Sequence, residues 1–147
     1  MTNIDVARVR QAADRLAGTI GVTPIEASAG LSEISGQDVW LKCENLQVTG
    51  SFKVRGAFFR ISELSDEQQA GVVAASAGNH AQGVALSAAQ LGIPATIFMP
   101  QDAALPKIIA TESYGAKVEL VPGNVGAALE AAQEFAARTG AQVIHPY

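Results

Sequence analysis

The sequence lacks several features that would point to other classes of protein. Its single cysteine, Cys43, excludes an intrachain disulfide and fits a reducing cytoplasm. Lys and Arg number 10 against 14 Asp and Glu, no basic run occurs, and the net charge is −4, so we expect neither nucleic acid nor an anionic membrane as the main partner. No apolar stretch is long enough to cross a bilayer, and the first residues lack the layout of a secretory signal. We therefore expect a cytoplasmic protein.

Common catalytic and nucleotide-binding motifs are also absent. The glycines at 18 and 21 and at 123 and 126 form only G-x-x-G pairs, which is no dinucleotide fingerprint, and no phosphate loop ends in Gly-Lys-Ser or Gly-Lys-Thr. A serine hydrolase would need a G-x-S-x-G elbow, which the chain does not contain. The only histidines, His80 and His145, have no cysteine or carboxylate at metal-ligand spacing, so we expect no metal site.

The composition is that of one globular unit with a real core. Of the 147 residues, 48% are hydrophobic and 16% are charged. From residue 71 onward a glycine, a short β-branched run and an alanine-rich stretch recur, with the glycines suited to the left-handed position that follows a helix. This pattern predicts an α/β fold, a parallel twisted sheet with right-handed βαβ crossovers in three α/β/α layers. The expected strands are 72–76, 95–99, 117–121 and 142–145, and the expected helices are 80–91, 103–114 and 125–138.

The first fifty residues have a different pattern. An amphipathic helix is expected from Val6 to Ile20, and short strands at 23–27 and 38–43 flank a turn at 30–36. We interpret this part as core packing without chemistry, with Cys43 as a small buried hydrophobe. A boundary is expected near Lys53. Residues 1–52 would belong to a different structural layer from residues 53–147, which form the α/β unit.

Lys53 is the first candidate for chemistry. Ser51 is a plausible N-cap for a helix over residues 52–64, which would place Lys53 in the first turn. The positive end of a helix disfavours an ammonium and so favours the neutral, nucleophilic amine. An amine placed there can form an imine with an aldehyde cofactor, and the preceding Phe52 could lie against a planar ring. The alternative is that Lys53 is a solvated surface lysine.

A second candidate is the small-residue segment Ser76-Ala77-Gly78-Asn79-His80. It follows the first strand of the repeat and opens directly into a helix, at the carboxyl end of a parallel strand, where open α/β sheets bind their ligands. Unpaired N–H groups at such a helix start can bind a carboxylate or a phosphate. The alternative is an ordinary serine-capped turn.

Two segments together resemble a known enzyme family. Residues 41–57 (LKCENLQVTGSFKVRGA) and 76–83 (SAGNHAQG) are similar to threonine dehydratase, a pyridoxal-phosphate enzyme of the tryptophan-synthase-β-like fold, fold type II. The similarity runs along essentially the whole chain, to the ending VIHPY at residues 143–147. Two separate motifs at the right spacing are far more specific than either alone.

The resemblance implies a cofactor, a reaction and residue roles. Lys53 would hold pyridoxal 5′-phosphate as an imine, Phe52 would lie beside the pyridine ring, and Asn79 would bond the cofactor's phenolate oxygen. Residues Ser76, Ala77, Gly78, Asn79 and His80 would bind the substrate carboxylate. Threonine would give 2-oxobutanoate and serine would give pyruvate, each with ammonia. The full-length protein would form homo-oligomers.

The departure from the family is length. Family members continue with further strands, a glycine-rich phosphate loop and a residue that meets the pyridine nitrogen, so we expect a truncated portion with residues 1–52 belonging to the larger domain and with little activity alone. Val54 favours the dehydratase and serine racemase branch, because sulfhydrylase-like members often carry an acidic residue there. Serine racemase and another fold type II enzyme stay open, as does a non-catalytic α/β fragment whose lysine is incidental.

Overall fold

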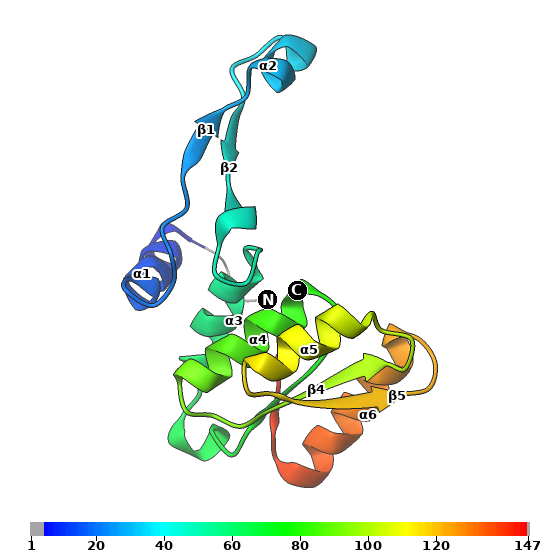
Figure 1. The fold of residues 1–147 in the computed structure, drawn as a ribbon. Helices are drawn as coiled ribbons and strands as arrows, with labels where there is room; N and C mark the ends of the chain where they lie inside the picture. Colours follow the sequence, from blue (N-terminus) through cyan, green and yellow to red (C-terminus); the bar gives the residue numbers. More distant parts are fainter. Residues whose placement is uncertain (1–4, 147) are drawn as a thin grey trace.

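The computed structural model describes residues 5–146 (Figure 1). Its helices are α1 Val6–Leu16, α2 Ala29–Ser35, α3 Lys53–Ile61, α4 Asn79–Gln90, α5 Leu105–Ser113 and α6 Val125–Thr139, with 3₁₀ turns η1 Glu44–Leu46 and η2 Asp66–Gln68. Its strands are β1 Ile25–Ala27, β2 Trp40–Lys42, β3 Val72–Ala75, β4 Ala95–Pro100, β5 Lys117–Val121 and β6 Gln142–Val143. Within this described part, no helix is long and apolar enough to span a membrane.

The α/β repeat forms one parallel sheet of strand order β5-β4-β3-β6. Val72 pairs with Ala95 on one side and with Gln142 on the other, so β3 is a central strand. All four residues of β3 are buried, as is usual for a parallel strand covered on both faces. The predicted parallel α/β fold is confirmed.

Helices cover both faces of the sheet, which makes three layers (Figure 1). Val72 and Ala74 of β3 pack with α3 and α4 in one apolar cluster, while the alternate residues Val73 and Ala75 pack with α6 in the other. This alternation follows from the pleat of a strand, which turns successive side chains to opposite faces. The layer of α3 and α4 holds the candidate site.

The first third of the chain projects from this unit (Figure 1). Strands β1 and β2 form an antiparallel ladder with α2 at its tip. Apolar side chains on this arm are exposed: Val22 is 97% exposed, Ile34 84% and Trp40 64%. Helix α1 has no buried residue either, within the part that the structure describes. The prediction of core packing here was therefore wrong for this chain, because nothing within residues 5–146 covers these side chains.

Several local predictions need correction. The expected turn at 30–36 contains helix α2, which Ser28 caps at one end and the left-handed Gly36 ends at the other. The last strand is only two residues long, and α1 ends at Leu16 rather than at residue 20. Gly71 has a φ of +158°, so it does not have the αL conformation expected after a helix. Cys43 is only half-buried, just after β2, so it is not the buried hydrophobe expected.

Candidate functional site

Helix α3 begins at Lys53 in a different way from the one predicted. Phe52 already has helical dihedral angles (φ −67°, ψ −13°), and Gly50, at φ +68°, makes the tight turn before it. Ser51 is buried, and its hydroxyl oxygen finds no hydrogen-bond partner among the described residues. The predicted Ser51 N-cap was therefore wrong, because the residue after it already belongs to the helical turn.

An ion pair holds α3 to the segment before it. The Arg55 guanidinium donates two hydrogen bonds of 2.8 Å to the two carboxylate oxygens of Glu44, and the Thr23 hydroxyl donates to the same carboxylate. These hydrogen bonds, first of all the one from Arg55, lower the pKa of Glu44 to about 2 although burial opposes them, and the carboxylate raises the pKa of Arg55. Arg55 lies two residues after Lys53, so the pair fixes the first turn of the helix that carries the amine.

Two further contacts hold the segment that leads to Lys53. The buried side-chain amide of Gln47 accepts a hydrogen bond from the Gly21 N–H at 3.0 Å and donates one to the Gly21 carbonyl at 2.7 Å. The Tyr114 hydroxyl, at the end of α5, donates to the Val48 carbonyl at 3.2 Å. Residues 44–55 are thus tied to two other parts of the chain, residues 21–23 and Tyr114.

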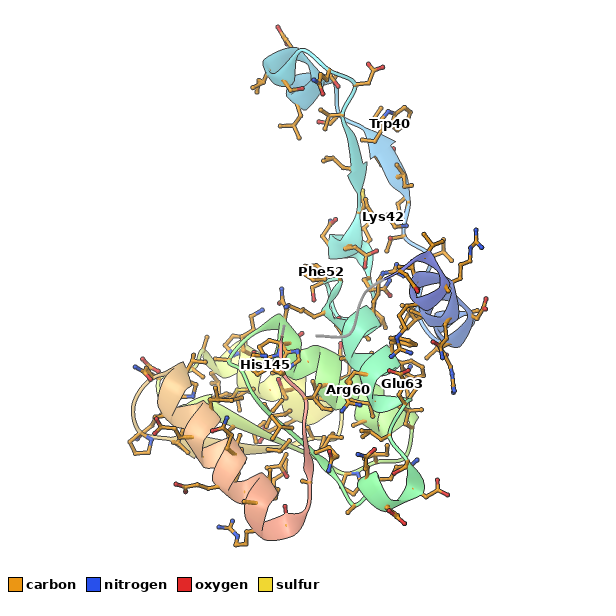
Figure 2. The ribbon with its side chains drawn as sticks, turned by 180° about the vertical axis from the view of Figure 1, so that it is seen from behind. Trp40, Lys42, Phe52, Arg60, Glu63 and His145 are labelled. Carbon is orange, nitrogen blue, oxygen red and sulfur yellow. The ribbon has the colours of Figure 1, made fainter. Side chains whose placement is uncertain are left out.

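Lys53 lines a cavity of about 350 Å³. One stripe of α3 lines it, at positions i, i+3, i+4 and i+7: Lys53, Gly56, Ala57 and Arg60. The small residues at 56 and 57 leave open space between the two long cations. Phe52, His80 and residues 143–146 line the rest. Figure 2 shows Phe52 just before α3, Arg60 on α3 and His145 on the segment after β6.

The cavity is electropositive. Lysine, arginine and two histidines line it, and no carboxylate does so within residues 5–146. The Lys53 amine donates to the Pro146 carbonyl at 2.9 Å and lies 5.3 Å from the centre of the Phe52 ring. Such a site suits an anionic ligand with a planar apolar part.

His80 connects the start of α4 to the end of β6. Its Nε2 lies 2.8 Å from the Ile144 carbonyl oxygen, which can only accept, so Nε2 carries the proton. Burial lowers the pKa of His80, and the positive charges of Lys53 and His145 act in the same direction, although the bond to Ile144 opposes them. The imidazole is therefore held neutral.

The rest of the predicted loop lies outside the cavity lining. The Ser76 hydroxyl accepts from the Gly78 N–H at 3.2 Å, and Gly78 caps α4 without a side-chain hydrogen bond. Asn79 is exposed, and its side-chain amide oxygen Oδ1 accepts from the Lys107 amine at 3.3 Å. Of the predicted site residues, the structure brings Lys53, Phe52 and His80 to one cavity, but Ser76, Ala77, Gly78 and Asn79 are not among its lining residues.

Sequence reasoning missed some lining residues. Arg60 could have been found, because it stands seven residues after Lys53 on the same helical stripe. His145 and Pro146 could not, because they reach the cavity only through the pairing of β6 with β3. The described residues hold no cluster of side chains that could bind a metal, so no residue of the site is assigned to one.

Comparison with known proteins gives consistent results. A family model described as "Pyridoxal-phosphate dependent enzyme" matches residues 16–147. The chain is 49% identical over 146 residues to an L-threonine ammonia-lyase of Thermotoga maritima, covering 98% of this chain and 36% of that protein. The fold matches a maize serine racemase with a TM-score of 0.89 and 36% identity, over 97% of this chain and 44% of that one. It matches the processed form of threonine deaminase isoform 2 from Solanum lycopersicum with a TM-score of 0.83 and 34% identity, over 99% of this chain and 44% of that one.

The chain therefore spans about a third of the length of the curated relatives it matches. The match covers nearly all of this chain, including the cavity and the helix that carries Lys53.

Proposed function

Because the chain belongs to the family of pyridoxal-phosphate-dependent enzymes, we propose that the protein converts L-threonine to 2-oxobutanoate and ammonia, and L-serine to pyruvate and ammonia, with Lys53 as the residue that holds the cofactor. The observation that carries this proposal is the placement of the Lys53 amine in an electropositive cavity beside an aromatic ring. A merely solvated lysine would not have these neighbours.

The residues present fit pyridoxal phosphate. A cavity of about 350 Å³ lies within the range of about 300–1,000 Å³ typical of small-molecule sites. The amine of Lys53 can condense with the aldehyde, the Phe52 ring can lie beside the pyridine ring, and the cations lining the cavity favour an anionic ligand. The Ser51 hydroxyl is buried just before α3 and makes no hydrogen bond to any described residue, so it can still donate one and accept others.

The candidate site residues have distinct roles in this proposal. Lys53 would act as the base that takes and returns a proton at its amine nitrogen. The N–H groups at the start of α4, where no side chain caps the helix, would bind the substrate carboxylate through residues 76–80. The Asn79 side chain would give up its hydrogen bond with the Lys107 amine, and its NH2 group would donate to the cofactor's phenolate oxygen. His80, held neutral, would keep this helix start against the end of β6 without adding a charge.

The cofactor, when bound, supplies an electron sink for the carbanion at the substrate's α-carbon. The protein's part is then orientation, exclusion of water and proton transfer.

Serine racemase is the second candidate. The maize serine racemase is 36% identical to this chain and the Solanum lycopersicum threonine deaminase 34%, so the solved structures do not separate the two reactions. The curated relatives favour threonine, because the Thermotoga maritima protein and a Staphylococcus aureus protein 52% identical over 127 residues are both named for L-threonine.

The test is an assay of the wild-type chain and of the longest natural form of the protein. We expect an absorbance change on titration with pyridoxal phosphate that is lost in Lys53→Ala and kept in Lys117→Ala, a lysine on β5 outside the cavity. We expect ammonia and 2-oxo acid from L-threonine. D-serine formation without 2-oxo acid would favour the racemase, and an unchanged absorbance in Lys53→Ala would favour the non-catalytic alternative.

Three proposals concern the whole protein. We place it in the cytoplasm and expect a homo-oligomer that binds an amino-acid substrate. Residues 1–52 would belong to the larger domain of the full-length protein, which would cover the exposed apolar side chains of the arm formed by β1, α2 and β2.

A further inference from the structure

Gly83, in the second turn of α4, lies against the backbone of the helix that carries Lys53. A Cβ atom built at Gly83 would lie 3.0 Å from the Lys53 carbonyl carbon, 3.0 Å from the Val54 nitrogen and 3.2 Å from the Lys53 carbonyl oxygen. These separations are shorter than the ordinary carbon contact of about 3.5–4.0 Å. The absence of a side chain at 83 is what lets α4 approach α3 this closely.

Other helical glycines of the chain do not have this environment. Beyond its own helix backbone and chain neighbours, a Cβ at Gly30 in α2 or at Gly56 in α3 would meet nothing described within 4 Å, and one at Gly126 in α6 would meet only the Asn124 side chain, with Oδ1 at 3.0 Å. Gly83 lies inside a regular helix with a negative φ, so its backbone conformation does not require glycine. Glycine costs about 1 kcal/mol relative to alanine in a helix interior, so its presence at 83 calls for a reason in the packing.

The neighbouring atoms all belong to the peptide bond between Lys53 and Val54. A peptide unit is planar and moves as one piece, so a Cβ at 83 could be accommodated only if the first turn of α3 and the second turn of α4 moved apart. Movement of α3 carries the Cα of Lys53 with it and changes the position of the amine relative to the Pro146 carbonyl, and movement of α4 changes the position of His80 relative to that amine. A flexible side chain could rotate away, but this backbone cannot.

We propose that Gly83 is a positioning residue that sets where the Lys53 amine lies in the cavity, through direct contact of α4 with the Lys53–Val54 peptide. The inference rests on the proposed function, since it concerns how readily Lys53 reacts with pyridoxal phosphate. Gly83 touches no reacting atom. It acts through the backbone of Lys53, and the start of α4, which bears His80, is set against the same helix turn by the same contact.

The test compares Gly83→Ala with two controls of the full chain. Val84→Ala truncates the fully buried side chain of the next residue on α4, and so destabilises the same helix while residue 83 remains a glycine. Gly30→Ala adds the same methyl group to a helix where it meets no other described atom. For each variant, the rate of pyridoxal-phosphate attachment at Lys53 is measured by borohydride trapping and peptide mapping, alongside the thermal midpoint.

We expect Gly83→Ala to slow attachment at Lys53 by about threefold to tenfold, because a shift of 1 Å at a reacting group can cost about a hundredfold and the shift here is a fraction of that. Val84→Ala and Gly30→Ala should stay within about twofold of the wild type. Equal slowing in Gly83→Ala and Val84→Ala would overturn the inference, as would a wild-type rate in Gly83→Ala. If Gly83→Ala alone fails to fold, the contact is a requirement of folding and the inference is also overturned.

A second readout separates this inference from the proposed function. The modification rate of Lys53 by a small amine-directed acylating reagent, relative to that of Lys117 in the same sample, needs no cofactor. If the wild-type chain attaches no pyridoxal phosphate but Gly83→Ala still changes this ratio by threefold or more, the proposed function fails and the positioning role stands. An unchanged ratio in Gly83→Ala contradicts the positioning role whatever the cofactor does.

Discussion

The ion pair between Glu44 and Arg55 should contribute measurably to folding, and replacing Glu44 with glutamine tests this. The substitution keeps the shape of the side chain, removes its charge and replaces one accepting oxygen with an NH2 group, so one of the two hydrogen bonds from Arg55 is lost and the other loses its ionic component. The Arg55 guanidinium is then left partly buried beside a neutral amide. We expect the free energy of unfolding to fall.

The magnitude follows from the pKa of Glu44, which is lowered from 4.5 to about 2. At about 1.36 kcal/mol per pKa unit, that shift corresponds to at most roughly 3.4 kcal/mol. The Arg55 side chain is 33% exposed and the Glu44 side chain 15%, so solvent screens part of this, and we expect about 1–2 kcal/mol. Because the folded-state pKa is the lower one, the contribution is complete above pH 4.5 and is lost as the pH falls toward 2.

The assay is urea unfolding of the wild type and Glu44→Gln between pH 7 and pH 3.5. With a urea m-value of about 2 kcal/mol/M, the midpoint should drop by roughly 0.5–1 M at pH 7, and the difference should shrink by about 40% at pH 3.5. The matched control is Glu119→Gln, which removes a more exposed ion pair with Lys117. If Glu44→Gln costs no more than Glu119→Gln, or if its cost does not depend on pH, the reasoning is refuted.

Three further predictions concern the packing around the site. Ile97→Ala, in the fully buried centre of β4, should destabilise the fold by about 2–5 kcal/mol in urea unfolding; a loss below about 1 kcal/mol would contradict the described core. Gln47→Ala should cost about 1–3 kcal/mol and speed hydrogen exchange at the Gly21 amide, whereas unchanged exchange there would argue against the Gln47 bonds. Burial lowers the pKa of His80, so its NMR titration midpoint should lie below 6.5, and the stability it contributes should fall as the pH drops below 6.5; a midpoint at or above 6.5 would contradict the burial.

The repeating part of the fold was predictable because local signals agree with one another there. The β-branched runs, the glycines after the helices and the helix lengths all indicate the same parallel sheet, and β5 at Lys117–Val121 was predicted at its observed bounds. The first third was less predictable. Helix α2 is only seven residues long, and the apolar pattern of α1 indicated a buried face, but Val6 and Val9 of that helix are exposed and Leu16 is only half-buried.

The candidate site was predictable only in part. Lys53 and His80 stand in motifs, and both line the cavity. The capping role of Ser51 was wrong because capping depends on the dihedral angles of Phe52, which the sequence does not specify. The close approach at Gly83 could not be foreseen, because a glycine inside a helix shows its reason only when the neighbouring helix is in place.

The central claim is that the amine of Lys53 attaches pyridoxal phosphate within the electropositive cavity. The most direct measurement is mass-spectrometric mapping of the wild-type chain after incubation with pyridoxal phosphate and reduction with borohydride. The account predicts one dominant adduct, on Lys53, at cofactor concentrations where Lys42, Lys107 and Lys117 are not modified. Equal labelling of all four lysines, or a dominant adduct on any of the other three, would contradict it.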